Sequence, residues 1–288
     1  MNPSISPCVK PLINMKRTTV SILWFLMTCA LVAQAVAGAH LPEDKYFDSD
    51  GILIRYIDIG EGTPIVLLHG AWGSLERWNK GDTLQILAKE YRVIAMDLRG
   101  HGKSGKPHGK AYYGAEMGRD ALRLLDHLGI SKAHFAGYSR GARIVGYLMA
   151  HSPDRLFTAI LGAREPMLEW DVTNVPSMEK LMARYKNRPS SQDPNAPAQD
   201  LVAMASAQLG RESWLVTLDQ LRSIDFPVLG IVGSKDSPEN VARLKGVIPL
   251  MEVVVIDGAT HGGETGAMRR SEFSQAVMKF LAKHSPGN

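Results

Sequence analysis

A serine between two glycines, Ser139 in the stretch GYSRG, is the residue whose type and setting first suggest chemistry. The preceding KAHFA predicts a buried strand, and the following ARIVGYLMAHSP has the spacing of a helix. A serine on so sharp a strand-to-helix turn has a strained backbone and projects its hydroxyl above the carboxyl edge of the sheet. Gly137 and Gly141 leave room where side chains would collide. We therefore predict a nucleophile at Ser139; the alternative is a serine that merely caps the helix.

A serine nucleophile needs a base to remove its proton and an acid to orient that base. Asp236 in IVGSKD follows one buried strand, and His261 in IDGATHGG follows the next. Loops after parallel strands emerge at the same sheet edge, so both side chains are expected near Ser139.

Glu165, just after another strand end, is the rival for the acid position. Asp257 is too close in sequence to His261 to reach across its ring. Three other histidines, His101, His134 and His151, lack a matching place at a strand end.

Five short motifs in this order resemble the α/β-hydrolase fold family: HGAWGS (69–74), DLRGHGKS (97–104), GYSRG, the Asp of GSKD and the His of GATHGG. Together they cover nearly all of residues 50–283. The resemblance implies that Ser139 is the nucleophile, His261 the general base and then acid, and Asp236 the residue that orients His261.

The oxyanion of an attacked carbonyl needs preorganised donors. The backbone N–H of Arg140 is one, because it follows the nucleophile at a helix N-terminus. The resemblance implies the backbone N–H of Ala71 as the second. It gives His69 a structural role in bonding loop backbone below the site, and makes His101 a residue that shapes its loop.

The elements that position these residues alternate along the chain. A β-hairpin is predicted at 46–62, and six buried strands at 64–70, 92–100, 132–138, 156–163, 227–233 and 251–258. Helical spacing occurs at 78–90, 114–128, 140–151, 238–246 and 270–283. The prediction is an α/β-hydrolase fold, a mostly parallel eight-stranded sheet with helices on both faces.

The alternation stops at about 164–221, where we predict a small lid inserted after the sixth strand. The alternative is a surface excursion whose methionine and aromatic residues pack its own small core. Trp72, Met167 and Trp170 are the predicted substrate-binding residues.

Residues 1–39 have the layout of a secretory signal peptide, with translation expected to start at Met15. A cationic start precedes an apolar run from about Val20 to Val32, which is shorter than the roughly 20 residues that span a bilayer. Cleavage after Ala37 or Ala39 would leave a hydrolase domain at 40–288, secreted or periplasmic and without a stable membrane anchor. The alternatives are an uncleaved membrane anchor and lipidation at Cys29. Cys8 and Cys29 are the two cysteines, so a cleaved chain could form no disulfide.

The charge excludes nucleic acid as an expected partner. The chain has 33 Lys and Arg against 29 Asp and Glu. Lys10, Lys16 and Arg17 lie before residue 38, and without them 30 basic side chains face 29 acidic ones. Residues 38–288 show no basic block of the kind that nucleic acids attract. No metal-binding cluster, phosphate-cradling loop or dinucleotide fingerprint is visible, so no cofactor and no metal are expected.

Hydrolysis of a small-molecule carboxylic ester through an acyl-enzyme is the predicted reaction. By the resemblance, haloalkane dehalogenases and epoxide hydrolases carry Asp where this chain has Ser139, which disfavours them. Serine members of the family instead hydrolyse lactones, cleave carbon–carbon bonds, transfer acyl groups or make peracids. These reactions, and a binding module without turnover, are the alternatives. The oligomeric state is not predicted.

Overall fold

The computed structural model describes residues 41–168, 176–188 and 198–286. The predicted leader at 1–39, with its start at Met15, lies outside the described residues, and so does Trp170. In the described part of the chain, no helix combines the length and the apolar character that crossing a membrane requires.

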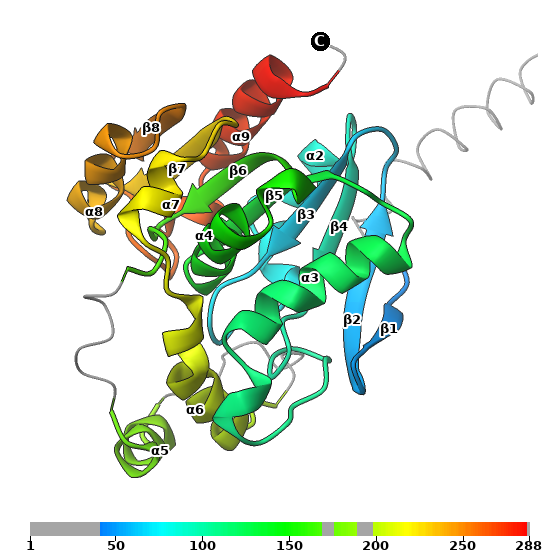
Figure 1. Cartoon of the computed structure of the whole chain (residues 1–288), viewed down its shortest axis with the longest axis vertical. Helices are drawn as coiled ribbons and strands as arrows, with labels where there is room; N and C mark the ends of the chain where they lie inside the picture. The colour runs from blue at the N-terminus through cyan, green and yellow to red at the C-terminus, as the bar shows by residue number, and fades with distance from the viewer. Residues whose placement is uncertain (1–40, 169–175, 189–197, 287–288) are drawn as a thin grey trace, which may run out of the picture. The chain divides into compact units, whose positions relative to one another are not determined.

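One eight-stranded sheet forms the centre of the hydrolase domain (Figure 1). Its strands are β1 Lys45–Ser49, β2 Ile52–Ile59, β3 Pro64–Leu68, β4 Arg92–Met96, β5 Ala133–Tyr138, β6 Leu156–Gly162, β7 Val228–Gly233 and β8 Met251–Ile256. Their order in space is β1-β2-β4-β3-β5-β6-β7-β8. β2 pairs antiparallel with β1 and with β4, and the other neighbouring strands pair in parallel. The predicted mostly parallel sheet and its leading hairpin are confirmed.

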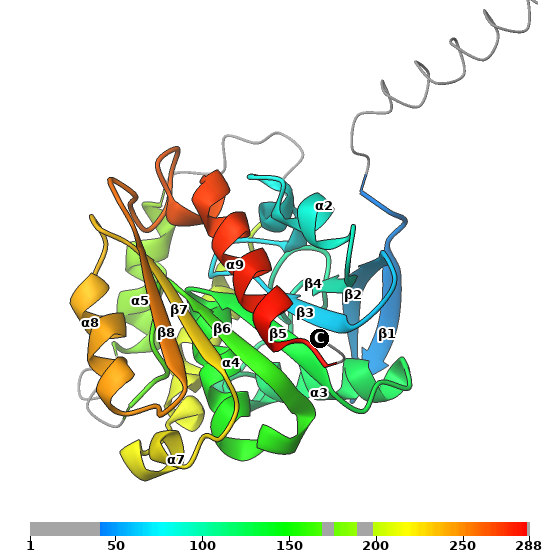
Figure 2. The same ribbon diagram turned by 90° about the horizontal axis from the view of Figure 1, so that it is seen from above.

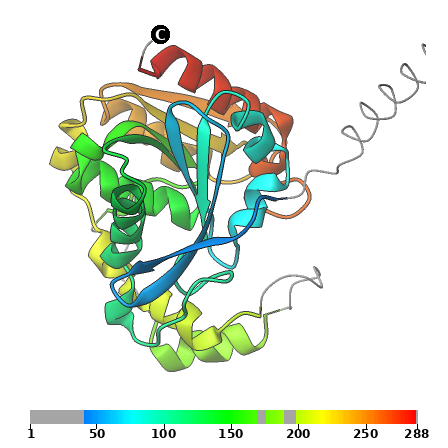
Figure 3. The same cartoon turned by 90° about the vertical axis from the view of Figure 1, so that its right-hand side faces the viewer.

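Helices cover both faces of this sheet, as Figures 2 and 3 show. The α-helices are α2 Thr83–Leu87, α3 Ala115–His127, α4 Arg140–His151, α5 Met178–Lys186, α6 Leu201–Leu209, α7 Leu218–Arg222, α8 Pro238–Ala242 and α9 Ser271–His284. Short 3-10 helices are η1 Leu75–Asn79, η2 Lys110–Tyr112, η3 Pro153–Arg155, η5 Gly210–Trp214, η6 Arg243–Gly246 and η7 Ala267–Arg269.

Alternate residues of each central strand face two separate hydrophobic clusters. In β3, Val66 and Leu68 join the cluster that includes α3 and α4, whereas Ile65 and Leu67 join the cluster that includes α2 and α9. Both sets are completely buried. A strand covered on both faces must be apolar at every position, which explains the uninterrupted apolar runs of the sequence.

The segment predicted to be one helix at 78–90 is instead the 3-10 helix η1 followed by the short α2. The chain turns between them at Gly81 and Asp82, where φ is 130° and 58°. A Cβ on Gly81 would lie 2.8 Å from the carbonyl oxygen of Met268. This close approach comes from a part of the chain far away in sequence, so helical spacing alone could not reveal the break.

The insertion between β6 and β7 contains α5, α6, η5 and α7, which ends at Arg222, one residue beyond the range 164–221 that the broken alternation indicates. Ser177 and Asp200 cap α5 and α6 by accepting backbone N–H groups of Lys180 and Ala203. An isolated parallel bridge between Leu168 and Val216 joins the two ends of the insertion. Trp214 and Val216 belong to the same hydrophobic cluster as α3 and α4, so the insertion shares the core of the sheet.

Helix α4 packs against β3 through Gly141. A Cβ at this position would lie 2.0 Å from the carbonyl oxygen of Leu68, a backbone atom that cannot rotate away. We predict that Gly141→Ala lowers the free energy of unfolding by about 1–3 kcal/mol, because α4 must move away from the sheet. Urea denaturation measures the change. Gly246→Ala is the control, because nothing lies within 4 Å of that Cβ; an equal loss in both variants would contradict the packing argument.

Candidate active site

Ser139 lies on the turn between β5 and α4 with φ 55° and ψ −108°. This left-handed backbone is strained for a residue with a side chain. The turn is tight because its flanking glycines touch: a Cβ on Gly137 would lie 2.2 Å from the carbonyl carbon of Gly141. The two glycines predicted to leave room for the turn therefore do so, and Ser139 is held directly at the N-terminus of α4.

The structure brings the three predicted side chains together. Nε2 of His261 lies 2.9 Å from Oγ of Ser139, and Nδ1 of His261 lies 2.6 Å from Oδ2 of Asp236. Asp236 follows β7 and His261 follows β8, so both come from the sheet edge that also carries Ser139. Because a carboxylate only accepts hydrogen bonds, the Nδ1–H group donates to Asp236, which leaves Nε2 free to accept the serine proton.

Glu165, the rival acid, lies elsewhere. Its side chain is only 3% exposed, and its Oε1 is 3.7 Å from a guanidinium nitrogen of Arg243. Asp257 accepts a hydrogen bond from the hydroxyl of Ser234. The carboxylate that contacts His261 is therefore that of Asp236.

Two side chains that the sequence reading missed fix the positions of Asp236 and His261. Arg164 donates from its guanidinium to Oδ1 of Asp236 at 3.0 Å, on the oxygen opposite the histidine. The hydroxyl of Tyr138 donates to the backbone carbonyl of His261 at 2.7 Å. Tyr138 is the last residue of β5, and Arg164 follows the end of β6, so both lie at the sheet edge that carries the site. This position is the one signal in the sequence that could have indicated them. Which way each side chain points depends on tertiary packing.

The loop after β3 approaches the serine closely. A Cβ on Gly70 would lie 3.2 Å from Cβ of Ser139, so the next residue, Ala71, begins beside the nucleophile. Arg140 is the first residue of α4, and its backbone N–H is one of the four that a helix cannot satisfy internally. The residues of the two predicted backbone donors, Ala71 and Arg140, thus line the same cavity as Ser139.

A buried histidine stabilises that loop, as predicted for His69. Burial lowers the pKa of His69, which keeps the ring neutral. Its Nε2 accepts the backbone N–H of Leu98 at 3.1 Å, so Nδ1 carries the proton and donates to the carbonyl of Gly70 at 2.7 Å. His101 is likewise buried and bonded through Nδ1 to the carbonyl of Arg99 at 3.0 Å. Both histidines bond to loop backbone.

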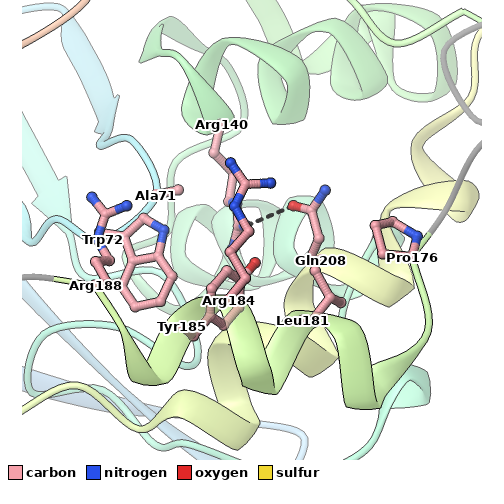
Figure 4. Close-up of a pocket in the computed structure, with 9 residues that line it drawn as sticks. All are labelled: Ala71, Trp72, Arg140, Pro176, Leu181, Arg184, Tyr185, Arg188 and Gln208. Carbon is pink, nitrogen blue, oxygen red and sulfur yellow. Dashed lines mark hydrogen bonds between the residues drawn. The ribbon is translucent and has the colours of Figure 1, made fainter.

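Two cavities open next to Ser139. The smaller, of about 150 Å³, is lined by Ser139 itself, and the larger, of about 400 Å³, lies under α5 (Figure 4). Trp72 lines the larger cavity, where its ring packs edge-on against Tyr185 at 4.6 Å. Met167 is completely buried in the hydrophobic core and lines neither cavity.

A search of the described residues for groups of three or more His, Cys, Asp or Glu that could hold a metal ion finds none.

Comparisons with known proteins agree with this architecture. A family model described as alpha/beta hydrolase fold matches residues 63–230. The dihydrolipoyllysine-residue acetyltransferase component of the acetoin cleaving system of Pseudomonas putida is 31% identical in an alignment of 278 positions, which covers 85% of this chain and 71% of the relative. A non-heme haloperoxidase of Rhodococcus erythropolis is 37% identical over 125 residues, 42% of this chain and 44% of the relative. The structure of a thermophilic esterase from Thermogutta terrifontis is 26% identical with a TM-score of 0.64, covering 85% of this chain and all of that one.

The short contact between His261 and Ser139 predicts a reactive serine. A fluorescent fluorophosphonate should label the wild-type chain and leave Ser139→Ala unlabelled. We expect His261→Gln to slow labelling by about 10²–10⁴-fold, because the base no longer removes the serine proton. His284→Gln, at the far end of α9, should label at the wild-type rate. Equal labelling of the His261 variant and the wild type would show that the histidine does not activate the serine.

Proposed function

The chain belongs to the α/β-hydrolase fold family, and from that premise we propose that it hydrolyses carboxylic esters through an acyl-enzyme on Ser139. The observation that carries the proposal is the continuous hydrogen-bonded line from Oγ of Ser139 through His261 to Asp236. A hydroxyl bonded to an imidazole that is oriented by a carboxylate has the geometry of an activated nucleophile.

In the first half of the reaction, Nε2 of His261 takes the proton of Ser139 as Oγ attacks the ester carbonyl. The carbonyl oxygen becomes an oxyanion, which the backbone N–H groups of Ala71 and Arg140 stabilise. Donors of this kind contribute about 3 kcal/mol each. The alcohol then leaves with the proton from His261, and the acyl group remains on Ser139.

In the second half, His261 accepts a proton from a water molecule, whose oxygen attacks the acyl carbon. The second oxyanion is bound by the same two donors. Its collapse releases the carboxylic acid while His261 returns its proton to Oγ of Ser139. Asp236 keeps the Nδ1 proton of His261 in place throughout and stabilises the imidazolium that forms in each half. Arg164 holds the other carboxylate oxygen, so the acid cannot rotate away from the ring.

The serine at the nucleophile position distinguishes this reaction from the chemistry of members of the fold that use an aspartate. The esterase from Thermogutta terrifontis supports ester hydrolysis, since it aligns over its whole length. The acetyltransferase and haloperoxidase relatives share the fold, and acyl transfer and perhydrolysis start from the same acyl-enzyme. The identity of the acceptor in the second half therefore separates these reactions.

Export remains part of the proposal. The cationic start, apolar run and small residues of positions 15–39 support a cleaved signal peptide. Sequencing the N-terminus of the protein recovered outside the producing cell's cytoplasm tests this. A chain that retains residues 15–39 would contradict cleavage.

The acid position gives a sharp test of the proposed mechanism. We expect Asp236→Asn to lower kcat by about 10⁴-fold, because an amide favours the wrong tautomer of His261. Glu165→Gln, which alters the neighbouring buried carboxylate, should keep kcat within a few-fold of the wild type. Steady-state kinetics on a p-nitrophenyl ester measures both. If only the Glu165 variant lost activity, the acid assignment would move to that residue.

A substrate profile tests the reaction class. We expect the wild-type protein to hydrolyse p-nitrophenyl esters and Ser139→Ala to be inactive at the same concentration. A lactone and a 1,3-diketone, assayed beside the esters, represent the other serine reactions of the fold. Consumption of the diketone alone would refute ester hydrolysis and leave the nucleophile assignment intact.

A further inference from the structure

The cavity that contains Ser139 is lined by four arginines and, among the described residues, by no acidic side chain. The arginines are Arg140, Arg143, Arg164 and Arg211. Arg164 is paired with Asp236, whose carboxylate also serves His261. Arg140 and Arg211 face no carboxylate among the described residues of the lining. Since residues 38–288 carry nearly equal numbers of basic and acidic side chains, this concentration is a local property of the site.

Arg140 gives the strongest indication that the cavity binds an anion, because its guanidinium is buried. Arg140 is 7% exposed, and its hydrogen-bond partners among the described residues are both neutral: Nε2 of His101 at 3.3 Å and Oε1 of Gln208 at 3.4 Å. Burial, together with the charges of Arg143 and Arg211, lowers the pKa of Arg140 to about 10. A buried cation without an anion close by is unfavourable. An anionic group in the cavity would supply the missing partner.

Two further donors at the same cavity have no acceptor among the described residues. The indole Nε1 of Trp214 is buried without a hydrogen-bond partner, although the side chain is 2% exposed and lines the cavity. Nε of Arg211 is buried and unsatisfied in the same way. Buried donors are nearly always paired in folded proteins. Unpaired buried donors on two residues that line one cavity favour a ligand that accepts hydrogen bonds there.

The larger cavity continues this basic lining. It shares Ala71, Arg140 and Gln208 with the smaller one and adds Arg184 and Arg188 from the α5 side (Figure 4). The guanidinium of Arg188 lies over the ring of Trp72, 4.5 Å from its centre. Among the described residues, this cavity also has no acidic side chain in its lining. A substrate that reaches Ser139 through either cavity meets cations.

We propose that the substrate of this site is an ester that also carries a carboxylate, which binds to Arg140, Arg211 and the indole N–H of Trp214 beside Ser139. The proposal rests on the ester hydrolysis proposed above and specifies its substrate class. A carboxylate accepts several hydrogen bonds at once and matches the planar fork of a guanidinium. A neutral ester would leave these donors buried and unsatisfied.

Matched ester pairs test the proposal. The first pair is mono-p-nitrophenyl adipate and its methyl ester, which places the charge on the acyl side. The second is 3-acetoxybenzoate and its methyl ester, which places the charge on the alcohol side. We expect the acid of at least one pair to exceed its methyl ester in kcat/KM by about 10- to 100-fold, the range of one or two hydrogen bonds to a charged group.

The variant Arg211→Gln should abolish most of that preference, because it raises KM for the carboxylated ester much more than KM for its methyl ester. Arg211→Lys should restore part of it. Arg222→Gln is the matched control, because Arg222 lies on the surface in α7 and pairs with Asp219. A preference that survives Arg211→Gln, or a methyl ester preferred in both pairs, overturns the proposal while ester hydrolysis stands.

A binding measurement separates this proposal from the catalytic one. Adipic acid monoanilide, an inert analogue, is titrated by calorimetry into Ser139→Ala and into Ser139→Ala with Arg211→Gln. We expect the second protein to bind at least 10-fold more weakly. Binding that depends on Arg211 while no ester is hydrolysed would refute the proposed function and retain the carboxylate site. Equal binding by both proteins would refute the carboxylate site.

Discussion

The left-handed backbone of Ser139 is the constraint on which the site depends. It exists because α4 packs so closely against β3 and β5 that Gly137 and Gly141 have no space for a side chain. The backbone N–H of Ser139 is also bonded to the carbonyl of Gly162 in β6, at 2.7 Å. A strained backbone conformation persists only where several surrounding elements hold the residue in it. Here three strands and a helix do so, and the hydroxyl is fixed before any substrate arrives.

The arginines of the site differ in whether a carboxylate neutralises their charge. Asp236 lies between His261 and Arg164, so one carboxylate orients the base and neutralises a neighbouring cation. Among the described residues, Arg140 has no carboxylate partner, although it lines the same cavity as the nucleophile. Keeping a guanidinium buried against neutral acceptors lowers the stability of the empty protein. Such a cost is typical of a residue retained for binding.

The sequence predicts the eight strands and the order of Ser139, Asp236 and His261 because each signal is local. An apolar run marks a strand buried on both faces, and the residue after it lies at a known sheet edge. The break at Gly81 and the direction of Arg164 are not local: the first depends on the carbonyl of Met268 and the second on the carboxylate after β7. Distant contacts of this kind have no periodic trace in the sequence.

The bridge between Leu168 and Val216 closes the base of the segment that covers the cavities. The backbone N–H of Val216 donates to the carbonyl of Met167 at 2.9 Å, so the two ends of the segment are tied together only a few residues from Arg164. Because the ends are tied at this bridge, the exposed side chains of α5 can change without shifting the strand ends that carry Ser139, Asp236 and His261. Residues of α5 also line the larger cavity, so a change of substrate preference can arise there while the three reacting side chains keep their positions.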